Sequence, residues 1–158
     1  MLSQCPSYQL TAKLQNMDYS ESEYFGFLTN HGFNGPFKFN VAYEQHSTFV
    51  KGNIVIDIAY DGGFWVSIIK TKKLIPELES GTKKYSDLGF NEYLDYPLSL
   101  LDPKKSENQS LSVKSKPIDQ LRYFSELLKE NPEILDGDLR KFRLLNQLWR
   151  KLGLRKKH

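Results

Sequence analysis

Apolar and polar residues alternate through the middle of the chain, between residues 37 and 70. The clearest run is Ile54, Ile56 and Ile58, which recur at every second position. Because successive side chains of a β-strand point to opposite faces, a period of two is typical of strands with one buried face. The strands expected from this pattern are 37–44, 48–60 and 64–70.

Short turn sequences separate these expected strands. Gln45–Ser47 fits a turn, and Asp61–Gly63 favours a tight hairpin because Asp and Gly tolerate positive φ. Lys51–Asn53 indicates either a bulge or a further turn. Strands joined in this way form an antiparallel meander, so we expect an antiparallel sheet of three or more strands.

Helical spacing appears on both sides of the sheet region. Ser20 and Glu23 have the spacing of a capping box, which predicts a helix over 20–31. Pro117 suits the first position of a helix that runs to about Glu130. A shorter helix is expected over 86–94, and residues 72–84 are expected to form a loop with at most one helical turn.

The last expected helix begins at Asp138, which can cap it. Its apolar stripe consists of Leu139, Phe142, Leu145, Trp149 and Leu152. Together, these elements predict an α+β fold in which the N-terminal and C-terminal helices pack on one face of the sheet. The other face, which carries Asp57, is expected to meet water.

The chain has 158 residues, a length that favours a single domain over 1–158. Within it, residues 102–116 have the composition of an exposed connection, and 154–158 form a basic tail. The N-terminus lacks a charged segment followed by an apolar one, which favours the cytoplasm and no membrane association. Cys5 is the only cysteine, so neither an intramolecular disulfide nor a cysteine zinc site is expected.

No catalytic motif stands out in the sequence. The glycines of Asp61–Gly63 precede a strand rather than a helix, so they do not predict a phosphate loop. The three histidines, His31, His46 and His158, have no metal-ligand spacing. We therefore expect no catalytic residue, no metal and no cofactor.

Two acidic regions are candidates for a protein-binding surface. Glu44 and Asp57 share the wetter sheet face with Trp65, and an aromatic residue beside carboxylates suits a protein contact. Those carboxylates also leave open an enzyme that uses Glu44, Asp57 or His46. The second region, an aromatic-rich stretch, contributes the carboxylates Asp87, Glu92 and Asp95, which could grip a basic partner.

Positive charge is concentrated at the C-terminal end. Residues 138–158 carry eight Lys or Arg side chains against one Asp, a net charge of +7, whereas the whole chain carries +3. Such asymmetry suits either a solvated helix face or a nucleic-acid contact. The residues that would make this contact are Arg150, Lys151, Arg155, Lys156 and Lys157.

Two groups of segments resemble parts of small uncharacterised bacterial proteins that are similar to the immunity partners of polymorphic toxins. The segments are Val41–Glu44, Ile54–Asp61 and Trp65–Ile68 in the strands, and Phe124–Leu128, Leu135–Asp138 and Phe142 in the helices. The resemblance implies a non-enzymatic protein that masks a toxin domain. It is the leading functional hypothesis, ahead of a nucleic-acid-associated accessory protein and, last, an enzyme.

Overall fold

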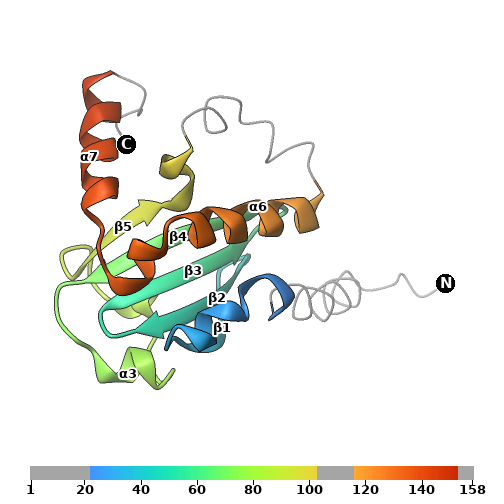
Figure 1. Ribbon diagram of the computed structural model, residues 1–158. Coiled ribbons are helices and arrows are strands. Elements are labelled where there is room, and N and C mark those ends of the chain that lie inside the picture. Colours follow the sequence, from blue (N-terminus) through green and yellow to red (C-terminus); the bar gives the residue numbers. More distant parts are fainter. Residues whose placement is uncertain (1–21, 103–115, 153–158) are drawn as a thin grey trace.

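The computed structural model of the protein describes residues 22–102 and 116–152. A five-stranded antiparallel sheet forms its centre, and neighbouring strands follow the order of the sequence (Figure 1). The strands are β1 (Asn34–Val41), β2 (Glu44–Lys51), β3 (Ile54–Tyr60), β4 (Phe64–Thr71) and β5 (Tyr93–Pro97). The α+β class and the antiparallel meander are therefore confirmed.

The first hairpin turn lies elsewhere than expected. Gln45–Ser47 belongs to β2, and the turn is formed by Ala42 and Tyr43 instead. Ala42 adopts a positive φ of 53°, a conformation that a residue with a Cβ rarely takes, so the sequence carried no turn signal there. At Lys51–Asn53 the turn, rather than the bulge, is correct, because β2 ends at Lys51 and β3 begins at Ile54.

The prediction of a helix over residues 86–94 is wrong. Only a short 3₁₀ turn, η1 (Tyr85–Asp87), forms there, and the chain then extends into β5. The backbone N–H of Lys72 donates to the carbonyl of Glu92 at 2.9 Å, and the ladder continues from Tyr93 pairing with Thr71. Pairing with the open edge of β4 satisfies more backbone groups than an isolated helix of this length would.

The first face of the sheet carries the larger hydrophobic core. Ile54, Ile56, Ile58 and Ile68 point to this side, and each is at most 4% exposed. The helical elements over this face are α2 (Phe27–Asn30), α6 (Pro117–Glu130), η3 (Pro132–Asp136) and α7 (Arg140–Lys151). Figure 1 shows α6 crossing the sheet in front of β3 and β4, so helices from both ends of the chain cover one face, as expected.

The boundaries of these helices agree closely with the sequence pattern. Helix α6 spans Pro117–Glu130. The N-terminal helix is interrupted: residues 22–25 are helical, Gly26 lies in a turn, and α2 follows. Helix α7 begins two residues after Asp138, whose carboxylate accepts a hydrogen bond from the Arg140 backbone N–H at 3.2 Å. Asp138 thereby satisfies one amide donor of the first turn.

Within the described part of the expected apolar stripe of α7, only the first two side chains are fully buried. Leu139 and Phe142 are at most 2% exposed, and the Phe142 ring stacks on Tyr96 with centroids 5.5 Å apart. Leu152, by contrast, is 61% exposed. Leu145, between Phe142 and Leu152, is partly buried against the same core, and the side chain of Trp149 lies outside what the structure describes.

The second face of the sheet is covered as well, which the sequence pattern did not indicate. Residues 72–92, here called the crossing segment, connect β4 to β5 and lie over this face. The single helical turn allowed there is α3 (Pro76–Glu79). A smaller core forms beneath it, made of Val50, Val55, Ile69, Leu78 and Leu88.

Two expectations concern residues outside those that the structure describes. They are the exposed connection, of which 103–115 are not described, and the basic tail 154–158. Ser20, half of the expected capping box, also lies outside.

Candidate functional site

A cluster of four polar side chains, Glu44, His46, Asp57 and Tyr85, lies on the second face. We call it the polar cluster. At its centre, Nδ1 of His46 lies 3.0 Å and 2.9 Å from the two carboxylate oxygens of Asp57. Both side chains are buried, with His46 7% and Asp57 2% exposed. Buried polar groups of this kind are stable only when they bond to one another.

Strand register explains why these two residues meet. In the antiparallel pair of β2 and β3, Thr48 lies opposite Asp57 and His46 opposite Ala59. His46 and Asp57 are thus diagonal neighbours on one face, a separation that an imidazole and a carboxylate can span. On the far side, the ring of Phe39 from β1 stacks on the His46 ring with centroids 5.0 Å apart.

Tyr85 joins the cluster from the crossing segment. Its hydroxyl donates to Oδ2 of Asp57 at 2.5 Å, and its ring meets the His46 ring edge-on with centroids 6.4 Å apart. Tyr85 stands in η1, 28 residues after Asp57, so this bond ties the covering layer to the sheet. Hydrogen bonds to a charged acceptor are stronger than neutral ones.

Glu44 completes the cluster at its outer side. Its Oε2 lies 3.3 Å from Nε2 of His46, and its side chain is 41% exposed. This distance is that of an ion pair. The geometry is not that of a hydrogen bond, because the buried Nε2 atom has no hydrogen-bond partner. Glu44 therefore acts on His46 chiefly through its charge.

The surroundings of His46 and Tyr85 raise the pKa of both side chains. Burial opposes protonation of the His46 ring, but the bond to Asp57 and the charges of Asp57 and Glu44 outweigh it and raise the pKa of His46. Burial and the Asp57 carboxylate raise the pKa of the Tyr85 hydroxyl well above its usual range. The two carboxylates thereby favour the protonated form of His46, and the Tyr85 hydroxyl keeps its proton as a donor.

The cluster connects two strands, β2 and β3, to the crossing segment, and its hydrogen bonds are directional. Thr48, which shares the face, donates its hydroxyl to the Phe37 carbonyl at 3.3 Å. No group of three or more His, Cys, Asp or Glu side chains in the described ranges could hold a metal ion. What this arrangement does most directly is fix the crossing segment on the sheet.

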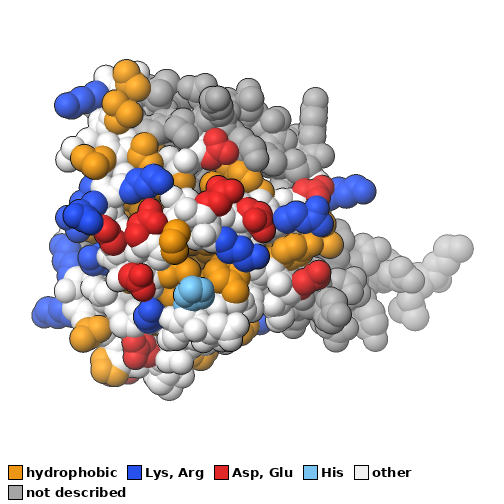
Figure 2. Space-filling model, viewed as in Figure 1, with side chains coloured by type: hydrophobic (Ala, Val, Ile, Leu, Met, Phe, Trp, Pro, Cys, Tyr) orange, Lys and Arg blue, Asp and Glu red, His pale blue; other side chains and the backbone are white. Residues whose placement is uncertain are grey.

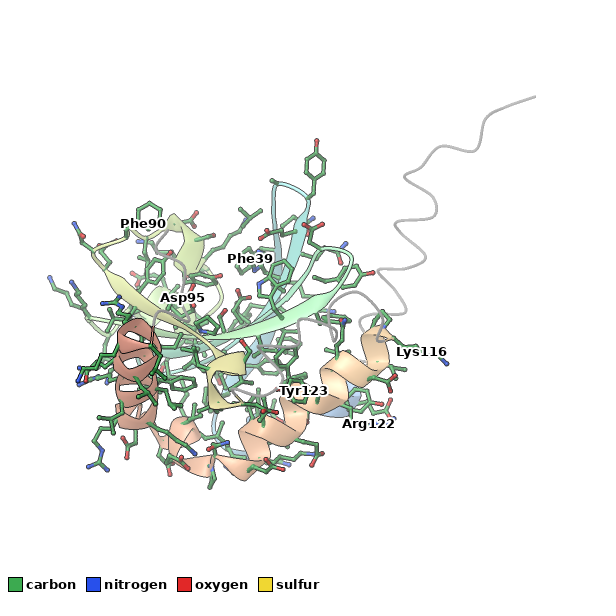
Figure 3. The ribbon with its side chains drawn as sticks, turned by 90° about the horizontal axis from the view of Figure 1, so that it is seen from above. Phe39, Phe90, Asp95, Lys116, Arg122 and Tyr123 are labelled. Atoms are coloured by element: carbon green, nitrogen blue, oxygen red, sulfur yellow. The ribbon has the colours of Figure 1, made fainter. Side chains whose placement is uncertain are left out.

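The outer surface of the crossing segment and the start of β5 is acidic and aromatic. We call residues 85–95 the acidic–aromatic segment; it contains Asp87, Glu92 and Asp95 and no Lys or Arg. Phe90 is 94% exposed there, whereas Tyr93 packs against Tyr85 with ring centroids 5.7 Å apart. Figure 3 shows Phe90 and Asp95 on the side of the sheet opposite Arg122 and Tyr123 of α6.

The residues expected to bind a partner are thus divided by the structure. Asp87, Glu92 and Asp95 are exposed and share one segment. Glu44 and Trp65 (37% exposed) lie instead on the sheet face beyond the cover of the crossing segment. The expectation that Asp57 faces water is wrong, because the crossing segment buries it beneath Tyr85.

The candidate nucleic-acid residues are placed only in part. Arg150 and Lys151 are exposed in the last turn of α7. Arg155, Lys156 and Lys157 lie outside the described residues.

A cavity of about 480 Å³ lies beside α6, away from the polar cluster. Asp119, Arg122 and Glu126 are among its lining residues, and the Tyr123 hydroxyl donates to Asp102 at 3.2 Å. Most of its charged groups are side chains of α6, of which Asp119 and Arg122 approach to 3.8 Å. It is lined by none of the candidate site residues predicted from the sequence.

Sequence reasoning missed Phe39 and Tyr85 as partners of the His46–Asp57 pair. The one signal for Tyr85 was its place in the aromatic-rich stretch, which does not reveal what the ring contacts. Comparison with protein-family models, with curated proteins and with solved structures gives no match. What the fold defines is an α+β protein with a five-stranded meander sheet, helices on one face and a tied crossing segment on the other.

Proposed function

We propose that this chain is a non-enzymatic protein-binding protein whose contact surface is the acidic–aromatic segment. The observation that carries the proposal is Phe90, a large aromatic side chain left 94% exposed among carboxylates. Aromatic side chains provide most of the binding energy at many interfaces, and surrounding charges select the partner. The partner would present a basic surface with an apolar recess for Phe90.

The way the segment is held supports this role. A binding surface gains affinity when it is already ordered before the partner arrives. The bond from Tyr85 to Asp57 and the burial of Leu88 (8% exposed) anchor the crossing segment just ahead of Phe90. Pairing of β5 with β4 anchors it on the other side.

An immunity-like role is the specific form of this proposal. A toxin that cuts nucleic acids would bind its substrate through a basic surface, and an acidic surface that covers this site would mask it. The segment has the matching sign, with three carboxylates and no cation over residues 85–95.

One observation favours the alternative that this chain is an enzyme, and another argues against it. Glu44, His46 and Asp57 do converge, as a catalytic role would need. The Nε2 atom of His46, however, is buried. A general base must reach the proton that it abstracts, so the arrangement favours a structural role.

Site-specific photo-crosslinking in the source cells tests the proposal. A benzophenone side chain at position 90 is expected to give one discrete adduct with another protein. The matched control carries the same group at Leu74, which is apolar, 72% exposed and outside the acidic–aromatic segment. No adduct at position 90, or the same adduct from both positions, would contradict the proposal.

The immunity-like form needs a separate measurement. The test needs an adjacent reading frame whose product arrests growth when it is expressed alone. Co-expression of this chain with that product should restore growth. The double variant Glu92→Lys/Asp95→Lys should lose this protection, while Lys72→Glu/Lys73→Glu, a double charge change outside the segment, should keep it. Protection that survives the first variant would rule out the acidic surface as the masking site.

A further inference from the structure

Helix α7 has an apolar flank that is largely exposed. Leu144, Leu148 and Leu152 are 67%, 50% and 61% exposed. Residues four apart lie above one another on a helix, so these side chains form one stripe. Three large apolar side chains in a row exceed the scattered exposure that is normal for a surface.

The opposite flank of α7 fixes the helix to the body of the protein. Phe142 is fully buried and stacks on Tyr96 of β5, and Leu139 is 2% exposed. Because one flank is held, the leucine stripe stays turned outward. Figure 1 shows α7 standing at the side of the sheet with its C-terminal end away from β3 and β4.

The remaining surface of α7 is strongly basic. The helix carries Arg140, Lys141, Arg143, Arg150 and Lys151 and no acidic residue. Of these, Arg140 is paired with Asp138 at 2.7 Å, and Lys141 donates to the Asn131 side chain at 2.6 Å. Figure 2 shows the blue side chains along the side where α7 stands, with hydrophobic ones between them.

We propose that α7 binds the surface of an anionic phospholipid bilayer, with its leucine stripe in the acyl boundary and its basic residues at the headgroups. A helix with an apolar flank beside Lys and Arg is typical of binding in the interface plane. Cations near an anionic bilayer add to the attraction. Helix α7 has 12 residues, too few to cross a bilayer, so it would lie in the interface plane.

The other occupants fit this surface less well. A nucleic acid would pair with the basic residues but would leave three leucines in water, because phosphate contacts use charge and not apolar area. A second copy of the chain would bring two α7 helices of the same positive charge together. A bilayer with anionic headgroups satisfies both the stripe and the charge.

Vesicle flotation with the full chain tests the proposal. The protein should float with vesicles of phosphatidylcholine and phosphatidylglycerol at seven to three, and bind pure phosphatidylcholine at least tenfold less. Leu144→Ser/Leu148→Ser should lower binding to the mixed vesicles at least tenfold. The matched control Leu74→Ser removes an equally exposed leucine elsewhere and should bind like the unmodified chain.

A charge variant separates the two contributions. Arg150→Gln/Lys151→Gln should weaken binding to the mixed vesicles and leave the urea midpoint unchanged. The proposal is overturned if the chain fails to float with the mixed vesicles, or if the leucine variant floats as well as the control. If the unmodified chain does not float, and it and the leucine variant are retained equally on a nucleic-acid column, α7 binds nucleic acid instead. These outcomes do not depend on the crosslinking at Phe90.

Discussion

The two faces of the sheet are built on different physical principles. The first face is an apolar layer in which Ile56, Ile58 and Ile68 are at most 1% exposed under the helices. The second face combines a smaller apolar cluster with the buried His46–Asp57 pair. Apolar burial is non-directional and supplies stability, whereas hydrogen bonds between buried groups require one geometry. From this comparison we expect the apolar layer under the helices to contribute more of the stability, and the polar cluster to fix where the crossing segment lies.

Adjacent residues of β4 allow the sharpest comparison of the two faces. Ile68 and Ile69 are both 0% exposed, but Ile68 faces the large core and Ile69 the small one. We expect Ile68→Ala to lower the free energy of unfolding by about 4–5 kcal/mol and Ile69→Ala by about 2–3 kcal/mol. A smaller core next to a loop segment can collapse more readily around the lost methyl groups.

Urea unfolding measures the loss of unfolding free energy in both variants. The substitution is the same in each, so the two losses can be compared directly. Equal losses, or a larger loss for Ile69→Ala, would mean that the two layers contribute alike.

Removal of the charge at Asp57 should have the next largest effect. Asp57→Asn takes away the carboxylate that binds both His46 and Tyr85. Breaking a buried ion pair from one side leaves the other partner without compensation, so we expect a loss of roughly 3 kcal/mol. The control is Asp61→Asn in the exposed β3–β4 hairpin, which should change stability by less than about 0.5 kcal/mol. A loss below 1 kcal/mol at Asp57 would contradict the cluster.

The stability that His46 contributes should depend on pH. Asp57 and Glu44 raise the pKa of His46 in the folded chain above the ordinary value of 6.5. The contribution is therefore complete below that value and is lost as the pH rises through the raised pKa. The stability difference between the unmodified chain and His46→Gln should be larger at pH 5.5 than at pH 8.5, in urea titrations that avoid tyrosine ionisation. A difference that is constant or grows with pH would show that His46 is neutral in the fold.

The smallest effect on stability is expected at Phe90. Because the side chain is 94% exposed, Phe90→Ser should change the free energy of unfolding by less than about 0.5 kcal/mol. Phe49→Ser, at a site 1% exposed, should prevent stable folding or cost several kcal/mol. A clear loss of stability in Phe90→Ser would mean that Phe90 packs in the fold and is not kept for a partner.

The apolar layer could be predicted from the sequence because its signal is periodic. The isoleucines of β3 and the helical spacing of 117–130 repeat a simple pattern, and each element appears where the pattern places it. The apolar stripe of α7 that begins with Leu139 and Phe142 was also visible, although periodicity does not tell which part of a stripe is covered.

The second face could not be predicted in the same way. Its cover is a mixed segment with one helical turn, and its attachment depends on a tyrosine 28 residues from its acceptor. A contact between distant residues leaves no local pattern, so Asp57 appeared to be a solvated strand residue. The positive φ of Ala42 and the short edge strand β5 were not predicted for a related reason, because tertiary context determines both.

The attachment of the crossing segment is tested most directly by hydrogen exchange in Tyr85→Phe. This variant keeps the ring and removes only the hydroxyl that donates to Asp57. A hydrogen bond to a charged group contributes about 1.5–3 kcal/mol, so amide exchange over residues 72–92 should accelerate at least about tenfold. Amides of β3 and α6 should keep their rates. Unchanged exchange over 72–92, or acceleration spread evenly across the sheet, would contradict the account.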